Sequence, residues 1–344
     1  MKIGNREIGG NNPVYVIAEM SANHAGSLEN AKEIVYAAKE AGADCIKLQT
    51  YTADTITMNC NNKYFHIDNG TWEGENLYHL YEKAYTPWEW QAELKALADK
   101  LQIDMFSTPF DKTAVDFLEE IGMDFYKIAS FELVDIPLIE YVASKNKPII
   151  MSTGMGNFEE ITEAVETIKK YHNDLILLKC SSAYPAITDQ MNLATMMDMK
   201  EKFGVDVGLS DHSMGSLGAV VAVAMGASVI EKHFCLSRDI ENPDSSFSME
   251  PKEFADMVRD IRACELAKGK VSYGPAKQEM SNTNFRKSIF VSADIKAGEI
   301  FTENNIRVVR PGYGMAPKHY KDVLGKVAAR DLEFGTPLKE DMVK

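Results

Sequence analysis

Short apolar or β-branched runs alternate with longer amphipathic stretches from residue 14 to residue 267, and the sequence contains eight of each. A strand followed by a helix, repeated many times, builds a parallel sheet, because each helix returns the chain across one face of the sheet. Eight such units predict a closed (β/α)8 TIM barrel. The alternative is an open doubly wound sheet. That fold usually has fewer units and a glycine-rich first turn, whereas the first turn here reads EMSANHAG.

The runs and stretches give the expected boundaries of the elements. Strands are predicted at residues 14–18, 45–49, 104–107, 125–128, 148–152, 175–179, 205–209 and 229–233. Helices are predicted near residues 28–41, 87–101, 112–121, 136–144, 158–171, 192–203, 216–226 and 251–267. Asp111 and Asn157 support these boundaries, because each can cap a helix that begins directly after it.

One unit is longer than the others, since residues 51–86 separate the second predicted strand from its helix. The segment is rich in aromatic side chains: Tyr51, Tyr64, Phe65, Trp72, Tyr78, Tyr81 and Tyr85. A loop of this length is usually functional or disordered. We expect an ordered excursion over the barrel mouth, and an aromatic patch packed for structural reasons is the alternative.

The pattern changes after residue 267. Residues 269–284 have the composition of a polar linker. Short β-like runs separated by turn signals follow at residues 288–292, 306–310 and 327–331. We therefore expect a barrel domain at residues 1–268 and a small β-rich domain at residues 285–344, which is short enough to depend on docking against something larger.

The composition excludes several classes of protein. A formal net charge of −14 argues against nucleic acid or an anionic membrane as a partner, and an anionic substrate would need a local basic cluster. No apolar run approaches the length of a membrane span, and the first residues lack the apolar core of a signal peptide. The five cysteines are widely spaced without a C-x-x-C pair, which fits neither a disulfide framework nor a zinc knuckle. A reducing cytoplasm is the expected location.

Reactive side chains are concentrated at the C-terminal ends of the predicted strands, where a barrel carries its active site. Ammonium and hydroxyl groups there suit a phosphate or carboxylate, since the former supply charge and the latter supply directed donors. These residues are Lys47, Lys127, Lys179, Lys232, Ser107, Thr108, Ser130, Ser152, Ser182 and Ser210. Each has a structural alternative: a lysine can extend along a helix–strand interface, a serine can cap a helix, and Glu231 can pair with Lys232 inside the barrel.

His212 and His233 end adjacent predicted strands, so both imidazoles can reach one point over the barrel mouth. Two neutral imidazoles with a carboxylate or water suit Mn²⁺, Fe²⁺, Co²⁺ or Zn²⁺. The spacing alone leaves open the alternative that both histidines are hydrogen-bonded to barrel carboxylates.

Eight runs resemble the sialic acid synthase family and occur in the family's order. They are AEMSANHAGS (18–27), AGADCIKLQTYTADTIT (41–57), STPFD (107–111), YKIASFE (126–132), MSTGM (151–155), KCSSAYP (179–185), GLSDHS (208–213) and VIEKHF (229–234). In the tail, RKSIFVSADIKAGE (286–299) and VRPGYGMAPK (309–318) resemble the antifreeze-like (SAF) domain of that family. EMSANH, YTADTIT and LYEKAYTPWEW (80–90) are similar to its pseudaminic branch, whereas sialic acid synthases typically read Glu-Ile-Gly-x-Asn-His near the start.

The resemblance implies an activity and its partners. Phosphoenolpyruvate would condense with an acetamido hexose, 2,4-diacetamido-2,4,6-trideoxy-L-altrose in the pseudaminic branch, and phosphate would leave by C–O cleavage. A divalent metal ion, Mn²⁺ before Mg²⁺ or Co²⁺, would be held by His212 and His233. The resemblance also implies a domain-swapped homodimer, in which Arg310 reaches the sugar site of the other protomer.

The remaining site residues are likewise implied position by position. Phosphoenolpyruvate contacts fall on Lys47, Thr108, Lys127, Ser130, Ser152, Ser182 and Ser210. Catalytic positions fall on Glu19, Lys127, Glu132 and Tyr184, and Asp244 falls on the sugar side. Ser182 stands where sialic acid synthases typically carry Asn.

Three other interpretations stay open. The same chemistry could act on N-acetylmannosamine or on the legionaminic precursor. A Schiff-base aldolase would use Lys127 or Lys179. Borohydride would trap its covalent adduct with the substrate, and EDTA would leave its activity intact. A binding protein would use the tail as its functional module, but that interpretation leaves the reactive strand ends unexplained.

Overall fold

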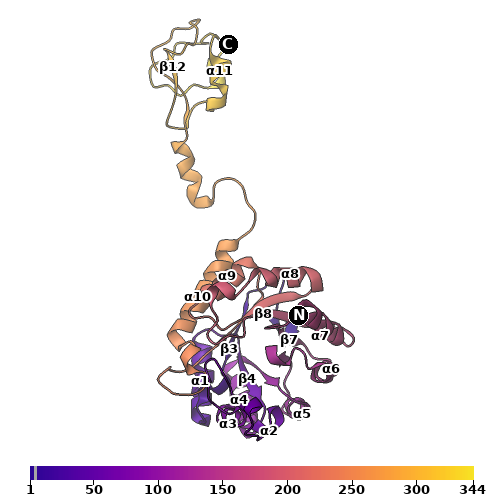
Figure 1. The fold of residues 1–344 in the computed structure, drawn as a ribbon. Helices are drawn as coiled ribbons and strands as arrows, with labels where there is room; N and C mark the ends of the chain where they lie inside the picture. Colours follow the sequence, from indigo (N-terminus) through magenta and orange to yellow (C-terminus); the bar gives the residue numbers. More distant parts are fainter. Residues whose placement is uncertain (4–5) are drawn as a thin grey trace. The chain divides into compact units, whose positions relative to one another are not determined.

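Eight parallel strands close into a barrel in a computed structural model of the chain, which describes residues 1–3 and 6–344. The strands neighbour one another in the order β10-β3-β4-β5-β6-β7-β8-β9, of which Figure 1 labels β3, β4, β7 and β8. They are β3 (Tyr15–Glu19), β4 (Cys45–Thr50), β5 (Asp104–Pro109), β6 (Tyr126–Ile128), β7 (Ile149–Ser152), β8 (Leu175–Cys180), β9 (Asp206–Asp211) and β10 (Val229–His233). Every predicted strand is found with its ends shifted by at most two residues, so the barrel prediction is confirmed.

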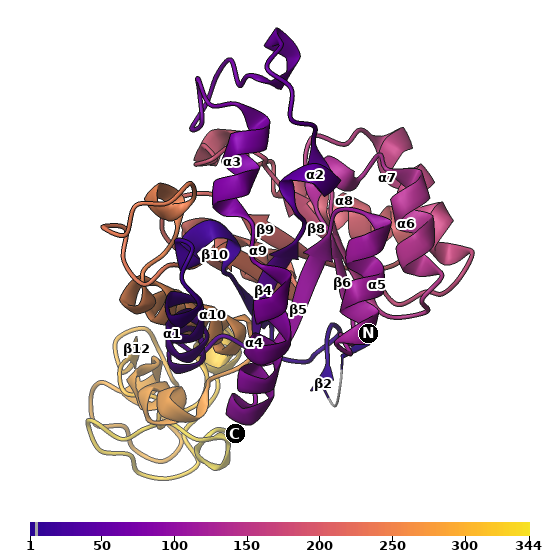
Figure 2. The same ribbon diagram turned by 90° about the horizontal axis from the view of Figure 1, so that it is seen from below.

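Helices surround the strands (Figure 2). They are α1 (Leu28–Glu40), α4 (Trp88–Leu101), α5 (Lys112–Glu120), α6 (Ile136–Ala143), α7 (Phe158–Lys169), α8 (Ala194–Phe203), α9 (Leu217–Met225) and α10 (Pro251–Lys268). The expected caps are present, because the Asp111 carboxylate accepts from the Ala114 amide at 3.1 Å and the Asn157 side chain accepts from the Glu160 amide at 2.9 Å. No helix in the described part of the chain is long and apolar enough to cross a membrane.

Side chains along each barrel strand alternate between two apolar layers. On β4, Cys45 lies in the cluster inside the barrel and Ile46 in the larger cluster between the strands and the helices. On β10, Val229 and Ile230 divide in the same way. Because successive side chains of a strand point to opposite faces, this alternation determines which residues at the strand ends face the barrel interior.

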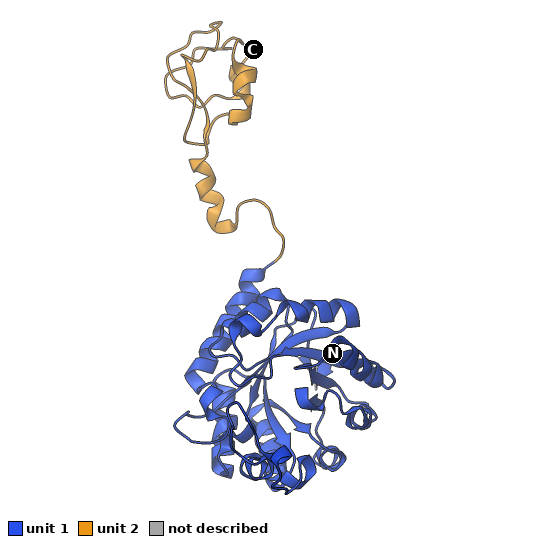
Figure 3. Ribbon diagram, in the orientation of Figure 1, with its two compact units in different colours: residues 1–269 blue, residues 270–344 orange. Residues whose placement is uncertain are grey.

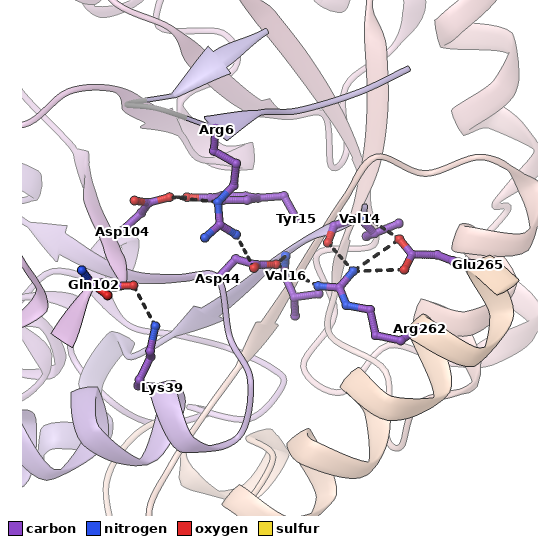
Figure 4. Close-up of polar contacts among 10 residues, drawn as sticks. All are labelled: Arg6, Val14, Tyr15, Val16, Lys39, Asp44, Gln102, Asp104, Arg262 and Glu265. Carbon is purple, nitrogen blue, oxygen red and sulfur yellow. Dashed lines mark hydrogen bonds and ion pairs between the residues drawn. The ribbon is translucent and has the colours of Figure 1, made fainter. Parts of the chain in front are cut away.

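Ion pairs and hydrogen bonds close the N-terminal end of the barrel (Figure 4). Arg262 of α10 donates to the Val14 carbonyl at 2.8 Å and pairs with Asp44 at 3.0 Å. Asp44 also accepts from the Val16 amide at 2.9 Å and pairs with Arg6. Arg6 lies in β2 (Arg6–Glu7), a short strand that pairs antiparallel with β1 (Lys2–Ile3). These ion pairs and hydrogen bonds stabilise this end of the barrel, which carries no predicted site residue.

The described chain divides into two compact units, residues 1–269 and 270–344 (Figure 3). The 3-10 helix η6 spans residues 277–285. It covers the last part of the expected linker and ends at the first residue of the expected tail domain. The second unit contains the antiparallel strands β11 (Ser288–Val291) and β12 (Ile306–Val309) and the short helix α11 (Tyr320–Val323). The β-like run at residues 327–331 makes only isolated bridges there, from Val327 to Ile300 and from Ala328 to Val343.

Candidate active site

Four charged side chains meet inside the barrel at the C-terminal ends of the strands, and we call them the inner charge cluster: Glu19, Lys47, Lys127 and Glu231. The Lys47 ammonium lies 2.9 Å from the Glu19 carboxylate and 3.0 Å from the Glu231 carboxylate. The Lys127 ammonium lies 3.8 Å from Glu231. All four side chains are at most 5% exposed. Burial of this kind strengthens charge–charge interactions and shifts protonation equilibria.

The cluster holds its members in different protonation states. Burial would raise the pKa of Glu231, but the charges of Lys127 and Lys47 lower it to about 2. Burial raises the pKa of Glu19 to about 7, against the opposing charge of Lys47. Burial also lowers the pKa of Lys127 to about 8, although Glu231 opposes that shift. Glu231 is therefore ionised at neutral pH. Glu19 and Lys127 have pKa values near neutrality, so each of them can gain or lose a proton there.

Two hydroxyl groups are hydrogen-bonded to members of the inner charge cluster. Lys127 donates to the Ser152 hydroxyl at 2.6 Å, and the Ser210 hydroxyl donates to Glu231 at 3.1 Å. The Thr108 hydroxyl is buried and has no hydrogen-bond partner within the described chain. Ser152 therefore lies beside a charge that would attract an anion, Ser210 is held by a carboxylate, and Thr108 has a hydroxyl that the described chain leaves unpaired.

Two further predicted contacts meet at Gly154, a residue that no sequence pattern indicated as part of the site. The Ser130 hydroxyl accepts from the Gly154 amide at 3.1 Å. A Cβ atom on Gly154 would lie 2.2 Å from the Ser182 hydroxyl and 2.6 Å from that of Ser130. Only a residue without a side chain allows these hydroxyls to occupy their present positions.

The anion-binding set expected from the sequence was too large. Lys232 is next to the inward-facing Glu231 and therefore points to the helix layer, where it pairs with Asp211 at 2.8 Å. The Ser107 hydroxyl likewise bonds with Thr50 at 2.6 Å, and Lys179 donates to the Cys180 carbonyl at 2.8 Å. The alternative in which Glu231 pairs with Lys232 is also wrong, because the two point to opposite faces. The ammonium groups of the inner charge cluster are thus those of Lys47 and Lys127.

His212 and His233 lie side by side at the ends of the adjacent strands β9 and β10, with ring centroids 5.3 Å apart. Nδ1 of His212 lies 3.0 Å from the Ser181 carbonyl, so in the neutral ring Nδ1 carries the proton and Nε2 has the free lone pair. Nδ1 of His233 is buried without a partner in the described residues. Neither imidazole is hydrogen-bonded to a carboxylate of the described chain, which was the alternative for this pair.

Both imidazoles fit the role of metal ligands, since each offers a nitrogen that the protein itself does not satisfy. Within the described residues, no group of three or more His, Cys, Asp or Glu is arranged to hold a metal ion. The pair would therefore supply two ligands, and water or substrate would supply the rest.

Aromatic side chains line the mouth beside the imidazoles, and we call Trp72, Tyr184 and Phe247 the aromatic wall. The Tyr184 ring lies 4.3 Å from His212, and the Phe247 ring lies 5.0 Å from His233. Trp72 lies 5.4 Å from Tyr184 and donates from Nε1 to the Pro243 carbonyl at 2.9 Å. Residues 51–86, with α2 (Ala53–Ile56), η2 (Lys63–Phe65) and α3 (Leu77–Ala84), thus form the expected ordered excursion, and Trp72 extends over the mouth.

Two further carboxyl groups belong to the site. Asp244 is buried and accepts hydrogen bonds from the Ser21 hydroxyl and, at 3.3 Å, the Ala22 amide, and burial raises its pKa. Gln49 donates to both Ser21 (2.9 Å) and Glu19 (3.1 Å), which links the Asp244 side of the site to the inner charge cluster.

Glu132 ends the 3-10 helix η3 (Ser130–Glu132). Its Oε2 atom is buried without a hydrogen-bond partner in the described residues, and burial raises its pKa to about 7. Arg310 directly follows β12 and is exposed on the second unit. Its predicted role at the sugar site of a partner protomer stays a prediction.

The chain is similar to several known proteins. Residues 34–273 match the model of the NeuB family, and residues 286–344 match the SAF domain. The chain is 48% identical to the pseudaminic acid synthase of Campylobacter jejuni, covering 99% of both chains. It is 36% identical to the N,N'-diacetyllegionaminic acid synthase of Legionella pneumophila, covering 97% of both. Among solved structures, the N-acetylneuraminic acid synthetase of Leptospira borgpetersenii in complex with citrate matches with a TM-score of 0.74 and 34% identity, covering 82% of this chain and 94% of that one.

Proposed function

The chain belongs to the NeuB family, and we propose that it is a pseudaminic acid synthase, a transferase that condenses phosphoenolpyruvate with 2,4-diacetamido-2,4,6-trideoxy-L-altrose. The observation that carries this proposal is one barrel mouth in which an anion site adjoins a pair of imidazoles. Lys47 and Lys127, together with the Ser152 hydroxyl that Lys127 contacts, form the anion site, and His212 and His233 form the pair. A condensation between an anionic donor and a carbonyl acceptor needs both.

Phosphoenolpyruvate carries a carboxylate and a phosphate, and we assign both groups to the anion site. Lys127 and Ser152 already share a hydrogen bond of 2.6 Å, and the Thr108 hydroxyl has no partner in the described chain. Groups held in this way are aligned before the substrate arrives, which reduces the entropy lost on reaching the reactive geometry. The glycine at position 154 keeps Ser130 and Ser182 close enough to contribute further donors.

We assign a divalent metal ion, Mn²⁺ in the first instance, to Nε2 of His212 and to His233. Such an ion would act as a Lewis acid on the aldehyde oxygen of the open-chain sugar. The chain's own contribution is orientation, since the Ser181 carbonyl fixes the tautomer of His212. The aromatic wall beside the pair would pack against the apolar parts of the acetamido sugar.

The reaction then follows from the placement of these groups. Carbon 3 of phosphoenolpyruvate attacks the aldehyde carbon and forms the new C–C bond, while positive charge develops at carbon 2. The C=O π bond breaks, and the aldehyde oxygen takes up a proton and becomes a hydroxyl group. Water adds to carbon 2 and loses a proton, and the tetrahedral intermediate expels phosphate by cleavage of the C–O bond. Phosphoenolpyruvate, the sugar and one water thereby give pseudaminic acid and phosphate.

We propose Glu132 as the group that takes the proton of the attacking water. Its Oε2 atom has no hydrogen-bond partner in the described chain, and its pKa of about 7 suits proton transfer near neutrality. Glu19 has a similar pKa but is held by Lys47 and Gln49, so we assign it to the sugar side of the site together with Asp244.

Two further features belong to the proposal. The protein would act in the cytoplasm, since the part of the chain that the structure describes holds five free cysteines and no disulfide. It would act as a domain-swapped homodimer in which Arg310 of one protomer reaches the sugar site of the other. A mass measurement in solution and an activity assay of Arg310→Ala test the second feature, and a monomer with full activity contradicts it.

Phosphate release from phosphoenolpyruvate tests the activity, with a panel of acetamido hexoses and with or without EDTA. We expect release only with the L-altrose sugar and a loss of activity with EDTA that Mn²⁺ restores. Preference for N-acetylmannosamine or for the legionaminic precursor would keep the chemistry and replace the acceptor. Trapping by borohydride with activity that EDTA leaves intact would instead show an aldolase.

A further inference from the structure

A buried ion pair lies directly behind the two imidazoles. The ammonium of Lys232 is 2.8 Å from the Asp211 carboxylate, and the two side chains are 1% and 0% exposed. Asp211 and Lys232 are also partners in the parallel register of β9 and β10. Because Asp211 precedes His212 and Lys232 precedes His233, the pair occupies the opposite face of the same two strand ends.

Lys232 is hydrogen-bonded to the two residues that flank His212 in the sequence. Its ammonium bonds to the Asp211 carboxylate and also to the carbonyl of Ser213. Asp211 in turn accepts from the Ser213 amide at 2.9 Å and from its hydroxyl. The residues on either side of His212 are thus bound to the residue that precedes His233. A shift of either strand end relative to the other would break these bonds.

The composition of the surrounding layer points to a role beyond packing. On four of the other strands an outward-facing residue near the end is apolar: Ala18 on β3, Leu48 on β4, Ile128 on β6 and Met151 on β7. The polar residues at this level on β4, β5 and β8 make no ion pair, since Thr50 bonds with Ser107 and Lys179 donates to a backbone carbonyl. A buried ion pair contributes little net stability compared with apolar residues of similar size, because both charges lose their hydration. Its directional bonds, however, fix a geometry that apolar contacts leave free to adjust.

We propose that Asp211 and Lys232 are positioning residues that fix the separation of His212 and His233 and thereby the affinity of the site for its divalent ion. This inference rests on the metal site in the proposed function. Their bonds do not touch a substrate, and they act through the backbone of the two strand ends. Removing one partner should therefore weaken metal binding before it affects any other contact of the site.

The test is the Kd for Mn²⁺ of the metal-free full-length protein. Electron paramagnetic resonance measures the concentration of free Mn²⁺ in the titration. We expect Lys232→Met to raise the Kd for Mn²⁺ by about 10–100-fold, the range typical for groups that orient metal ligands. Asp211→Asn, which keeps the size of the side chain, should raise the Kd in the same direction. It also serves as the second variant if Lys232→Met does not fold.

The matched control is Arg262→Met, which breaks the partly buried pair with Asp44 at the opposite end of the same barrel. It should lower the melting temperature and leave the Kd for Mn²⁺ within twofold of the wild-type value. Folded Lys232→Met and Asp211→Asn proteins that bind Mn²⁺ as the wild type does would overturn the proposal. Wild-type protein that binds no Mn²⁺ would overturn the metal site itself and this inference with it, and the two failures are therefore distinguishable.

Discussion

The Lys47 ammonium lies 2.9 Å from the carboxylate of Glu19, yet burial and the charge of Glu231 still raise the pKa of Glu19 to about 7. A carboxyl group whose pKa is raised from 4.5 binds a proton in the folded protein that the unfolded chain has already released. Between these two pH values the folded state is therefore the more protonated one. It follows that Glu19 makes the free energy of unfolding fall as the pH rises from 4.5 to about 7.

Glu19→Gln should remove this contribution, so the variant should lose less stability than the wild type between pH 5 and pH 7.5. A shift of this size corresponds to about 3 kcal/mol at most. Urea unfolding followed by tryptophan fluorescence measures it, because Trp72, Trp88 and Trp90 all belong to the barrel unit. Glu132→Gln should act in the same direction, since the pKa of Glu132 is also raised to about 7. An unchanged pH dependence in Glu19→Gln would contradict the prediction.

Glu132→Gln should lower kcat by about 10²–10⁴-fold, the usual contribution of general acid–base catalysis. The fold should be unaffected, because the buried Oε2 atom has no hydrogen-bond partner in the described chain that the amide could disrupt. Steady-state kinetics from pH 6 to pH 8 measures the effect, and the wild-type rate should rise through pH 7 as the carboxyl group ionises. Glu159→Gln, an exposed change on α7, is the control and should retain wild-type kinetics. A Glu132→Gln enzyme with wild-type kcat would remove the assigned base.

Lys127 should make the binding of phosphoenolpyruvate depend on pH. Burial lowers its pKa to about 8, so its positive charge is present below that pH and lost above it. The KM for phosphoenolpyruvate should therefore rise as the pH increases from 7 to 9. Lys127→Arg keeps the charge throughout this range, so the rise should disappear in that variant. A flat wild-type profile, or the same rise in Lys127→Arg, would show that another group titrates.

Gly154→Ala should damage substrate binding more than it damages the fold. The added Cβ atom would meet the Ser182 and Ser130 hydroxyls at 2.2 and 2.6 Å, and both are ends of side chains that can rotate away. We expect the KM for phosphoenolpyruvate to rise at least tenfold with little change in melting temperature. Gly208→Ala is the matched variant, because its Cβ atom would lie 2.2 Å from the Val229 carbonyl of the barrel backbone. That variant should lose about 1–3 kcal/mol of stability. The reverse pattern would show that Gly154 serves the fold.

Much of the barrel could be predicted because its pattern is local. Each strand and helix is a run of a few residues, and capping residues such as Asp111 and Asn157 mark helix starts within the same run. The small domain was harder to predict. The run at residues 327–331 has the composition of a strand but makes isolated bridges, since its pairing depends on partners distant in the sequence.

The position of the site could be predicted from the sequence, but the face of each strand on which a given side chain lies could not. The ends of the strands were found within two residues, whereas a shift of one residue exchanges the inner and outer faces of a strand. For that reason the sequence predicts Lys232 and Ser107 in the anion site, although it is their neighbours Glu231 and Thr108 that face the interior. The contact of Trp72 with Tyr184 could not be derived either, because it joins two loops that no local pattern relates.

Trp72 should determine the affinity for the sugar and not that for phosphoenolpyruvate. It contacts Tyr184 of the aromatic wall and holds the loop of residues 51–86 on the Pro243 carbonyl through a hydrogen bond of 2.9 Å. Trp72→Phe keeps the ring contact but loses this bond, whose typical value of about 1 kcal/mol corresponds to a roughly fivefold rise in the KM for the sugar. Trp72→Ala loses both and should raise that KM by about 10–100-fold, because an aromatic contact adds to the lost hydrogen bond. The KM for phosphoenolpyruvate should stay within twofold in both variants, since the residues of the anion site lie on the barrel strands and not in this loop.

Tyr64→Ala, in the same loop but 77% exposed, is the control and should change neither value. Equal effects of Trp72→Ala on both substrates would instead show that the loop supports the whole mouth and does not select the sugar.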